Sequence, residues 1–573
     1  MQAWFDDKTN HVKVRFAYNP RMIRQIKSIR GSRWHSAEKV WLVPYNKYSI
    51  DRLIQWGVKL DNILKSKTES LKNTSSTQSS SIKKSYQDHK EIIPYIKNKL
   101  PKKLLEKLHS YQIEGVAYTE SRNGRILNAD QMRLGKTVQS LAWLSIHPEI
   151  NTIIIVCPAT IKLKWKEEIQ IWLGKRAKVL YGKSSNIKKL LHGVIYIINY
   201  DIVADWINIL KELNPDCIII DECHKIKTKG KIKKGKAGKI AKFTGIKKTG
   251  AVTHLSKGVK HIIGLSGTPL LNRPIEIFNI CSIIDSTIFP SRFAFGIHYC
   301  DGKNNGYGWN FNGASNMDEL YKILTSTIMI RRLKKDVIKQ LPPVTRTFIP
   351  FEIENRIEYI RAEIDLIKWL KSIGETEKAL RASRAEGLVH MSALKKLALE
   401  GKINQVIEWI DDFLESEEKL VVFTSHTYTI DKLLKKFGDI SVRIDGSTSA
   451  KNRKLAEEQF QTNKNIKLFI GNMKAASEGI TLSIADNIVI TEPPSDWSPG
   501  TLSQAESRIE KIGLNIGNLY VHYLWAKDTI EDMIYGVVAK KDKIINSALD
   551  GVSENINTYS ELIKYFKTIR SFE

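Results

Sequence analysis

Short apolar runs rich in β-branched residues recur along the chain, and stretches with helical spacing separate them. Runs of this kind predict buried parallel strands of α/β units. A first set occupies Ile153–Val156, Val194–Ile198 and Cys217–Ile220. A second set follows a charged, predominantly helical stretch and occupies Leu420–Phe423, Leu468–Ile470 and Ile488–Ile490. The pattern therefore predicts two α/β lobes joined by helices.

Residues 1–62 have a different pattern. Apolar and basic residues alternate from His11 to Tyr18, which is typical of a half-buried strand. Helical spacing follows over Pro20–Ile29, and Trp34 and Trp41 then indicate a hairpin or a pair of short strands. We expect a small α+β unit. Its twelve Lys/Arg against five Asp/Glu leave two interpretations open, a solvated basic face or a DNA-binding accessory module.

Residues 64–88 are rich in Ser, Thr and Lys and carry too few apolar side chains to offset the entropy of ordering. We interpret 63–95 as a flexible linker. The expected divisions after it are lobe 1 at 96–345, a helical connector at 346–400, lobe 2 at 401–550 and a C-terminal tail at 551–573.

Composition narrows the class of protein. A length of 573 residues predicts several domains, and 42% hydrophobic with 26% charged residues excludes global disorder. No apolar run reaches membrane-span length and no signal-peptide pattern opens the chain, so we expect a soluble intracellular protein with no membrane partner. Five cysteines without a C-x-x-C pair argue against a disulfide scaffold or a zinc site. The net charge of +29 predicts a polyanionic partner, nucleic acid before a membrane surface.

The segment 225–260 concentrates that charge, with thirteen lysines and no Asp or Glu among several glycines. Self-repulsion predicts a mobile loop that stays extended until an anion arrives. A solvated face or a localisation signal would look similar, but its place after a strand that ends in carboxylates favours a nucleic-acid contact. The candidate contacts within it are Lys231, Lys233 and Lys234.

A phosphate-binding loop is the first piece of chemistry. Ile126–Thr137 follows an apolar segment, precedes a helical pattern and ends in Gly135, Lys136 and Thr137. In such a loop the lysine reaches the β/γ-phosphates of a nucleotide and the hydroxyl holds Mg²⁺. The match is incomplete, because Asp130 occupies the position of the usual first glycine.

Three further segments complete the constellation. The strand Ile218–Ile220 ends in Asp221, placed to hold Mg²⁺, and Glu222, which can orient and deprotonate the attacking water. Leu265–Pro269 follows, and Gln504–Gly513 lies in the second lobe. A cation from that lobe could stabilise the transferring phosphoryl group only when the cleft closes, which couples hydrolysis to lobe motion.

In this order the segments resemble the motifs of SWI/SNF-type helicase-related ATPases of superfamily two, from about Leu108 to Asp550. The resemblance implies two RecA-like P-loop lobes with parallel sheets and helical insertions. It also implies ATP and Mg²⁺ as cofactors, with Gln112 on the adenine base and Arg508 and Lys511 as the cations of lobe 2. Further nucleic-acid contacts are implied at Thr160, Lys162 and His426.

The match narrows to the HARP annealing-helicase branch. Its features are found at Phe289–Asp301, Tyr307–Asn316, Arg331–Val337 and Arg443–Ser449, and the N-terminal unit is similar to the HARP domain over some 35 residues. Four positions depart from the pattern, among them Cys223 in place of the usual alanine and Leu514 in place of the usual glutamine. Arg133 stands where the family usually has glycine, and Lys511 keeps the charge of an arginine but loses its bidentate fork.

The resemblance implies an ATP-dependent translocase on duplex, forked or junction DNA that remodels forks or anneals strands, with a single-stranded DNA-binding protein as a candidate partner. An RNA-directed helicase and a non-hydrolysing, ATP-gated clamp stay open as alternatives. Residue usage suggests a bacterial or phage source and hence the cytoplasm or nucleoid. A eukaryotic source would place the protein in the nucleus.

Overall fold

The structure is a computed structural model of the chain. Its described residues are 2–6, 11–19, 22–23, 25–26, 29, 32–36, 38–45, 47–65, 67, 88–182, 189–227, 231–234, 240–244, 247–304, 308–338, 344–372, 384–416, 418–476, 479–510 and 518–551. Only the backbone is described at 47–48, 51, 55, 231–234, 240–244, 366–372 and 384–389. Most of the expected linker, the tail from 552 and Lys511 lie outside the described residues.

Two compact units make up the chain, one formed by Met1–Gln87 with Lys303–Asn310 and the other by the remaining residues. The first holds a five-stranded sheet in the order β3-β4-β2-β1-β5. Its elements are β1 (Gln2–Asp6), β2 (His11–Arg15), β3 (Arg33–His35), β4 (Val40–Pro44), α2 (Lys47–Gln55) and β5 (Lys59–Leu60). Trp34 pairs with Trp41 across the antiparallel strands β3 and β4, which confirms the predicted hairpin. In β2 the side chains of Val12 and Val14 are buried, as their alternation with basic residues predicted.

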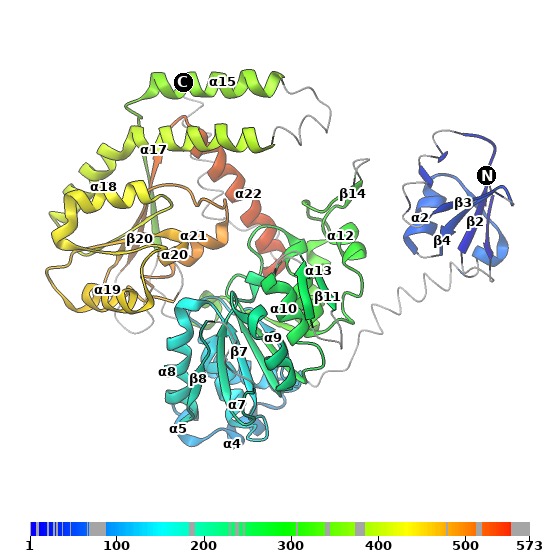
Figure 1. The fold of residues 1–573 in the computed structure, drawn as a ribbon, viewed down its shortest axis with the longest axis horizontal. Helices are drawn as coiled ribbons and strands as arrows, with labels where there is room; N and C mark the ends of the chain where they lie inside the picture. The colour runs from blue at the N-terminus through cyan, green and yellow to red at the C-terminus, as the bar shows by residue number, and fades with distance from the viewer. Residues whose placement is uncertain are drawn as a thin grey trace. The chain divides into compact units, whose positions relative to one another are not determined.

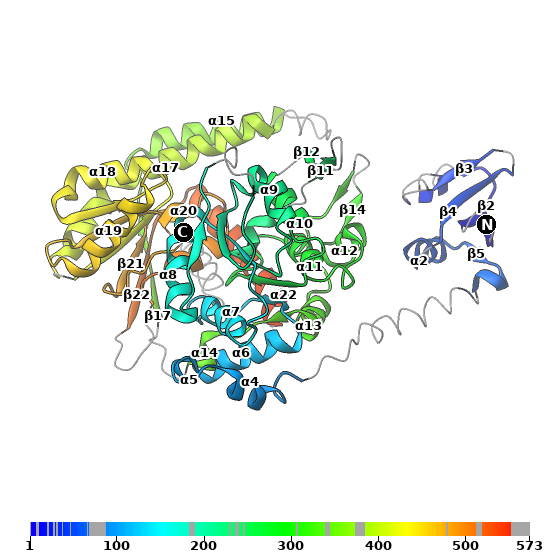
Figure 2. The same ribbon diagram turned by 60° about the horizontal axis from the view of Figure 1, so that its bottom comes forward.

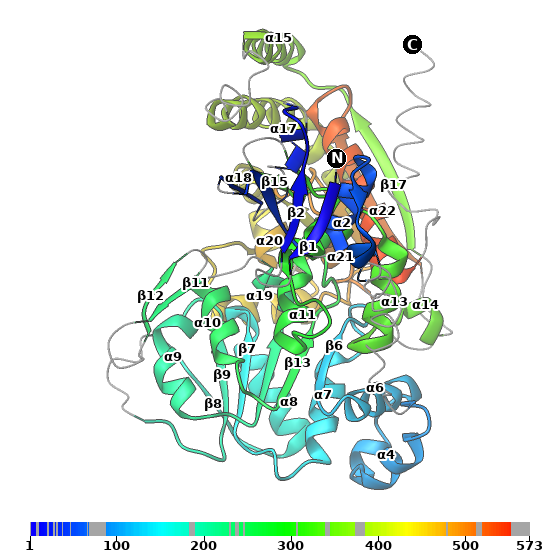
Figure 3. The same cartoon turned by 90° about the vertical axis from the view of Figure 1, so that its right-hand side faces the viewer.

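The second unit contains both predicted lobes. Lobe 1 is built on a seven-stranded parallel sheet in the order β16-β6-β13-β10-β7-β9-β8, much of it visible in Figure 3. Its strands are β6 (Arg125–Asn128), β7 (Ile153–Cys157), β8 (Ala177–Val179), β9 (Ile195–Asn199), β10 (Cys217–Asp221), β13 (His261–Leu265) and β16 (Met329–Ile330). The first helices are α4 (Ile93–Lys99), α5 (Lys102–Leu105), α6 (Ser110–Ser121), α7 (Lys136–Ser145), α8 (Lys162–Leu173) and α9 (Val203–Glu212). Those that follow are α10 (Lys247–Leu255), α11 (Phe278–Ile284), α12 (Arg292–Tyr299), α13 (Met317–Thr327) and α14 (Lys334–Val337).

Helices cover both faces of the lobe 1 sheet, which explains why its strands are apolar at every position. In β7, Ile153 and Ile155 belong to one core with residues of α6, α7 and α8. Ile154 and Val156 belong to a second core with residues of α9, α10 and α11. The period of two in a strand therefore divides one apolar run between two cores.

The lysine-rich segment 225–260 differs from the predicted mobile loop. Its described parts include the antiparallel strands β11 (Lys231–Lys234) and β12 (Ile240–Thr244) and the helix α10. Ala251, Val252 and Leu255 of α10 are buried in a core of lobe 1. The count of lysines concealed this apolar stripe, which anchors the C-terminal part of the segment.

Lobe 2 is a six-stranded parallel sheet in the order β17-β22-β21-β18-β20-β19. Its strands are β17 (Val344–Phe351), β18 (Leu420–Thr424), β19 (Ser441–Ile444), β20 (Leu468–Asn472), β21 (Asn487–Ile490) and β22 (Leu519–Ala526). Its helices are α15 (Arg356–Ser372), α17 (Arg384–Leu414), α18 (Thr427–Phe437), α19 (Ala450–Thr462), α20 (Met473–Ala476), α21 (Pro499–Glu506) and α22 (Ile530–Asp550). The start of the expected helical connector at 346 is instead strand, because β17 pairs along its whole length with β22 (Figure 2).

Helix α22 links the cores of the two lobes, running from lobe 2 toward α13 in Figure 1. Ile534 and Val538 in its first half belong to a core of lobe 2. Ile545 and Leu549 in its second half belong to a core of lobe 1. Each lobe thus packs apolar side chains on the same helix, and movement between the lobes must bend or repack it.

Two expectations from the sequence concern disulfides and membrane-spanning helices. All five cysteines are buried free thiols, so none forms a disulfide. Among the described helices, none combines the length and hydropathy that crossing a membrane requires.

Candidate active site

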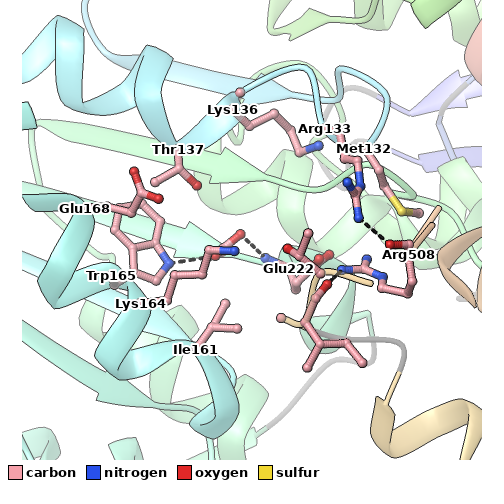
Figure 4. A pocket seen from close by; sticks show the side chains of 15 residues that line it. Met132, Arg133, Lys136, Thr137, Ile161, Lys164, Trp165, Glu168, Glu222 and Arg508 are labelled. Atoms are coloured by element: carbon pink, nitrogen blue, oxygen red, sulfur yellow. Dashed lines mark hydrogen bonds between the residues drawn. The ribbon is translucent and has the colours of Figure 1, made fainter. Parts of the chain in front are cut away.

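A cavity of about 270 Å³ lies where the phosphate loop of lobe 1 meets lobe 2. Figure 4 shows Lys136, Thr137 and Glu222 around this space, with Arg508 entering from the other lobe. The lining residues are Met132, Arg133, Gly135, Lys136, Thr137, Ile161, Lys164, Trp165, Glu168, Asp221, Glu222, Gly479, Ile480, Thr481 and Arg508. Most of the residues predicted to handle the nucleotide therefore share one cavity.

The phosphate loop connects β6 to the first turn of α7. Gly135 precedes the helix with φ +75°, a left-handed conformation that glycine adopts without strain. Lys136 begins the helix, and its Nζ donates to the carbonyl oxygens of Asp130 at 2.9 Å and Gln131 at 3.3 Å. Burial lowers the pKa of the Lys136 ammonium, while the nearby carboxylates, Glu222 foremost, act in the opposite direction. A helix N-terminus with a lysine tied only to backbone oxygens is suited to receive an anion.

Asp130, where the loop pattern usually has its first glycine, anchors this loop. Its carboxylate is fully buried and accepts hydrogen bonds of 3.0 Å from Arg332 Nε and from Gln139 Nε2, in addition to a contact with Arg332 Nη2. The backbone N–H of Arg332 also donates to it at 3.0 Å. Gln139 was not predicted, and Arg332 was noted only as part of the segment Arg331–Val337, with no role assigned to it. The only signal in the sequence was the unexpected carboxylate itself, which needs a buried cation as its partner.

Gln112 lies beside the loop. Its Oε1 accepts the backbone N–H of His109 at 3.0 Å, which caps α6, and its Nε2 donates to the carbonyl of Leu134 at 3.4 Å. A Cβ on Gly135 would lie 2.3 Å from this amide nitrogen, so the glycine is required for the close approach. The predicted contact with adenine remains a prediction, with Gln112 placed against the phosphate loop.

Asp221 ends β10 at the carboxyl edge of the sheet. Its Oδ2 accepts the indole N–H of Trp165 at 2.7 Å and its Oδ1 accepts the backbone N–H of Glu222 at 2.9 Å. Burial, followed by the charge of Glu222, raises the pKa of Asp221 to about 7. A divalent cation beside this carboxylate would offset both effects.

Glu222 follows with φ +50°, in the left-handed region that non-glycine residues rarely occupy. Its Oε2 lies 3.2 Å from His224 Nδ1 without hydrogen-bonding geometry, and this buried oxygen has no hydrogen-bond partner among the described residues. Burial opposes ionisation, yet the proximity and charge of His224 outweigh it and lower the pKa of Glu222 to about 2. An ionised carboxylate with an unsatisfied oxygen is suited to hold a water molecule.

The oxygen donors present fit Mg²⁺. The described residues include no group of three or more His, Cys, Asp or Glu side chains that could hold a metal on their own. Mg²⁺ bound together with a nucleotide needs only one or two protein oxygens, because phosphates and waters complete its octahedron. Thr137 and Asp221 line the same cavity and supply a hydroxyl and a carboxylate of the required type.

On the lobe 2 side, Arg508 follows the end of α21. Its Nε donates to the carbonyl of Gln504 at 3.0 Å and its Nη1 to that of Ile480 at 3.1 Å. These bonds hold the guanidinium at the cavity wall, and its role toward a phosphoryl group stays a prediction. Lys511, the second predicted cation, lies outside the described residues.

The residues predicted to contact nucleic acid lie in different parts of the structure. Thr160 lies in a short 3₁₀ turn opposite Gly479 of lobe 2, and its buried hydroxyl has no hydrogen-bond partner among the described residues. His426 precedes α18, held through its backbone N–H by Glu492 at 2.8 Å. Lys231, Lys233 and Lys234 lie in β11, where only the backbone is described.

Lys162 corrects the prediction that it contacts DNA. Its ammonium is buried and donates to the carbonyl of Leu180 at 3.1 Å and to Asn199 Oδ1 at 3.0 Å. It also lies 4.2 Å from the centre of the Tyr181 ring. The ammonium of Lys162 therefore bonds to groups within lobe 1. The neighbouring Lys164, in contrast, is exposed and lines the cavity.

Comparison with protein-family models assigns most of the second unit. The SNF2-related domain matches residues 111–398, and the helicase conserved C-terminal domain matches residues 401–513. Both matches agree with the order of motifs read from the sequence.

Similar proteins occur in several animals. The chain is 32% identical over 474 residues to the "SWI/SNF-related matrix-associated actin-dependent regulator of chromatin subfamily A-like protein 1" of Xenopus laevis, covering 81% of this chain and 46% of that protein. Its homolog in Caenorhabditis elegans is 30% identical over 548 residues, covering 93% and 74%. The human "DNA annealing helicase and endonuclease ZRANB3" is 29% identical over 482 residues, covering 80% and 42%. The chain thus spans about half the length of the vertebrate relatives it matches.

Among solved structures, the Sulfolobus solfataricus SWI2/SNF2 ATPase core in complex with dsDNA is 24% identical, with a TM-score of 0.36. The match covers 78% of this chain and 93% of that one. A domain match over half of the chain and 30% identity to the nematode homolog establish the family of this chain. The chain belongs to the SNF2-related family, in the branch that contains the subfamily A-like protein 1 and ZRANB3 proteins.

Proposed function

We propose that this chain is an ATPase that uses hydrolysis to move on duplex or branched DNA. The observation that carries the proposal is the single cavity lined by Lys136, Asp221 and Glu222 of lobe 1 and by Arg508 of lobe 2. A nucleotide held there contacts both lobes, so that its hydrolysis changes the contacts between them.

The proposed division of labour follows from the chemistry of each side chain. Lys136 holds the β/γ-phosphates at the N-terminus of α7, and Glu222 orients the attacking water and accepts its proton. Arg508, with Lys511, balances the charge that develops on the transferred phosphoryl group. Mg²⁺, held by Thr137 and Asp221 when it is bound, supplies further neutralisation of phosphate charge.

DNA as the substrate is supported by the net charge of +29. Binding through phosphates predicts strong dependence on salt and little dependence on sequence. Thr160, Lys164, His426 and the lysines of β11 are the proposed backbone contacts. Trp34 in the N-terminal unit is 50% exposed, beside Arg33 on β3, and offers a stacking surface for an unpaired base at a fork.

Fork remodelling or strand annealing is the proposed outcome of movement. The name of the human relative describes it as a DNA annealing helicase, and in this proposal the N-terminal unit recognises the junction. Partnership with a single-stranded DNA-binding protein is part of this proposal. We propose the nucleus of a eukaryotic cell as its location, since the animal relatives give no support to the bacterial or phage source expected from residue usage.

Two other functions can be distinguished from this one by measuring phosphate release with different nucleic acids. The sequence Asp221-Glu-Cys-His224 also fits an RNA-directed helicase, for which RNA would stimulate hydrolysis more than DNA does. A non-hydrolysing clamp would close on DNA with ATP but release no phosphate. Arg133 is the observation that favours the clamp, because its side chain hydrogen-bonds the backbone of lobe 2.

The test is phosphate release by the full chain with single-stranded, duplex, forked and RNA ligands at two salt concentrations. We expect forked or duplex DNA to stimulate the rate most, with stimulation falling steeply at the higher salt concentration. Lys136→Ala and Glu222→Gln should each lower kcat by at least about a hundredfold. Lys435→Ala, which removes an exposed lysine of α18, serves as the matched control and should have no effect. Equal rates for all ligands would contradict the proposal.

A further inference from the structure

Arg133 occupies a backbone conformation that suits its side chain poorly. Its φ is +66°, in the left-handed region, at the loop position where glycine was expected. Glycine would adopt this angle without steric cost, whereas an arginine adopts it only when surrounding contacts hold it there. Contacts of the Arg133 guanidinium therefore have to hold the residue in this conformation.

The guanidinium of Arg133 reaches across the cavity to the other lobe. Its Nη2 donates to the carbonyl oxygen of Arg508 at 2.6 Å, and its Nη1 donates to the carbonyl oxygen of Glu510. Figure 4 shows this side chain extending from the phosphate loop to the backbone of Arg508. The two hydrogen bonds therefore join the phosphate loop to the segment that carries the proposed arginine finger.

The acceptors explain why a cation is favourable here. Arg508 and Glu510 lie just beyond the C-terminus of α21, and their carbonyl oxygens are hydrogen-bond acceptors that a buried guanidinium can satisfy. Burial, followed by the charge of Arg508, lowers the pKa of Arg133 to about 10, so the group is still protonated at neutral pH. Its hydrogen bonds are therefore charge-assisted and shielded from water.

A second contact attaches the segment Arg508–Glu510 to lobe 1. Lys334 of lobe 1 forms an ion pair with the carboxylate of Glu510. The side chain of Lys334 is 9% exposed and that of Glu510 is 23% exposed. Arg133 holds the backbone of the segment and Lys334 holds a side chain, so two cations of lobe 1 bind the same segment of lobe 2.

We propose that Arg133 is a positioning residue that latches Arg508–Glu510 onto the phosphate loop and keeps Arg508 at the active site before ATP and DNA bind. This inference rests on the proposed function, since it assigns Arg133 a role through Arg508. The latch should give the chain a high rate of ATP hydrolysis in the absence of DNA. A chain without the latch must rely on DNA to bring the lobes together, whereas in this chain the latch itself holds Arg508 beside the phosphate loop.

The first experiment measures closure without hydrolysis. The five native cysteines are buried, so cysteines introduced at the exposed Lys175 of lobe 1 and Lys464 of lobe 2 can be labelled selectively. Energy transfer between the dyes is recorded on the full chain without ATP or DNA. We expect Arg133→Gly to lower the transfer efficiency and Arg133→Lys, which keeps one cationic donor group, to lower it less.

A matched control is available in another ion pair between the lobes. Lys454 Nζ lies 3.0 Å from Glu167 Oε1, with side chains 69% and 57% exposed. An exposed pair contributes little, so Lys454→Ala should leave the transfer efficiency unchanged. Thermal melting of each variant separates loss of the latch from loss of the fold, and glycine at a left-handed position should not lower the melting temperature.

The second experiment separates basal from DNA-stimulated hydrolysis. Arg133→Gly should lower basal kcat about tenfold, as expected for losing a charge-assisted hydrogen bond, with little change in KM for ATP. At saturating DNA its kcat should approach that of the native chain, because DNA then supplies the closure. A merely structural role would lower both rates together.

The outcomes of the two experiments are distinct. Unchanged energy transfer in Arg133→Gly, or equal losses of basal and DNA-stimulated rate, would overturn the latch. If the native chain hydrolyses no ATP under any condition, the proposed function fails, while the energy-transfer measurement still decides whether Arg133 holds the lobes together.

Discussion

Gln504 Nε2, on helix α21 of lobe 2, donates a hydrogen bond of 3.2 Å to the hydroxyl oxygen of Thr268 in lobe 1. The backbone N–H of Thr268 donates in turn to Ser266 Oγ at 3.2 Å, and that hydroxyl lies 3.0 Å from His224 Nδ1. His224 is also the neighbour that most strongly lowers the pKa of Glu222. A short series of polar contacts therefore connects the proposed general base to the helix that precedes Arg508.

Breaking this series at its interlobe step should uncouple the lobes. We predict that Thr268→Val, which keeps the shape but removes the acceptor, lowers DNA-stimulated kcat about tenfold while KM for ATP changes little. The physical reason is that Glu222 and Arg508 are then no longer positioned through common contacts. Steady-state kinetics with saturating forked DNA measure the effect.

A double-mutant cycle provides the control. Gln504→Ala and Thr268→Val should have similar effects, and the double variant should be no slower than the slower single variant. Additive losses would mean that the two side chains act independently, and the interlobe hydrogen bond would then have no part in coupling.

The fold was largely predictable because its strongest signals are local. Apolar runs such as Ile153–Val156 mark strands buried on both faces, and a glycine–lysine–threonine turn can only precede a helix if it is to cradle phosphates. The carboxylates after β10 were likewise predictable, since the ends of parallel strands meet at one edge of the sheet.

What could not be predicted depends on contacts between residues far apart in sequence. No periodicity indicates that Asp130 pairs with Arg332, or that α22 packs in both lobes. Lys162 was misjudged for the same reason, because its burial depends on Asn199 and on the carbonyl of Leu180. A charged residue in a sequence does not reveal whether its partner is the solvent, a ligand or the chain itself.

The pairing of Asp130 with Arg332 yields a second prediction. Arg332→Met would leave a fully buried carboxylate without its cation, which typically costs about 3–5 kcal/mol. The phosphate loop should loosen first, since Asp130 lies within it. Hydrogen exchange over residues 129–136 should accelerate and ATP affinity should fall. A combined Asp130→Asn, Arg332→Met variant should recover part of the stability, and no recovery would show that the charge is not the cause.

A third prediction concerns the interior of lobe 2. Lys402 is fully buried on α17, and its ammonium donates to Glu531 of α22 at 2.7 and 2.8 Å and to the carbonyl of Leu524 at 3.0 Å. Lys402→Met should destabilise lobe 2 by about 3–5 kcal/mol, because it leaves the buried carboxyl group of Glu531 without its cation.

The control replaces both charges. The Lys402→Met, Glu531→Gln variant removes the charge imbalance and should melt at a higher temperature than Lys402→Met alone. Thermal denaturation followed by circular dichroism measures all three proteins. A single variant as stable as the native chain would mean that the pair contributes only to packing.

The last prediction uses pH. His147, just beyond α7, lies between two carboxylates, with Nε2 2.7 Å from Glu120 Oε2 and Nδ1 2.7 Å from Glu149 Oε1. The hydrogen bond with Glu120 raises the pKa of His147, against the effect of burial. Its folded-state pKa lies above the unfolded value. The charged pair therefore stabilises the fold fully below the unfolded pKa, and this stability is lost as pH rises through the folded pKa.

His147→Gln should accordingly destabilise lobe 1 more at about pH 5.5 than at about pH 9, with a difference on the order of 1 kcal/mol. Glu120 stays ionised at the lower pH, because the same hydrogen bond lowers its pKa. Differences in melting temperature between variant and native chain at each pH measure the effect and cancel the titration of groups that do not contact His147. His192→Gln, at an exposed position, is the matched control. A loss for His147→Gln that is equal at both pH values would mean that the charge of the imidazole contributes nothing and that only its packing against Trp143 matters.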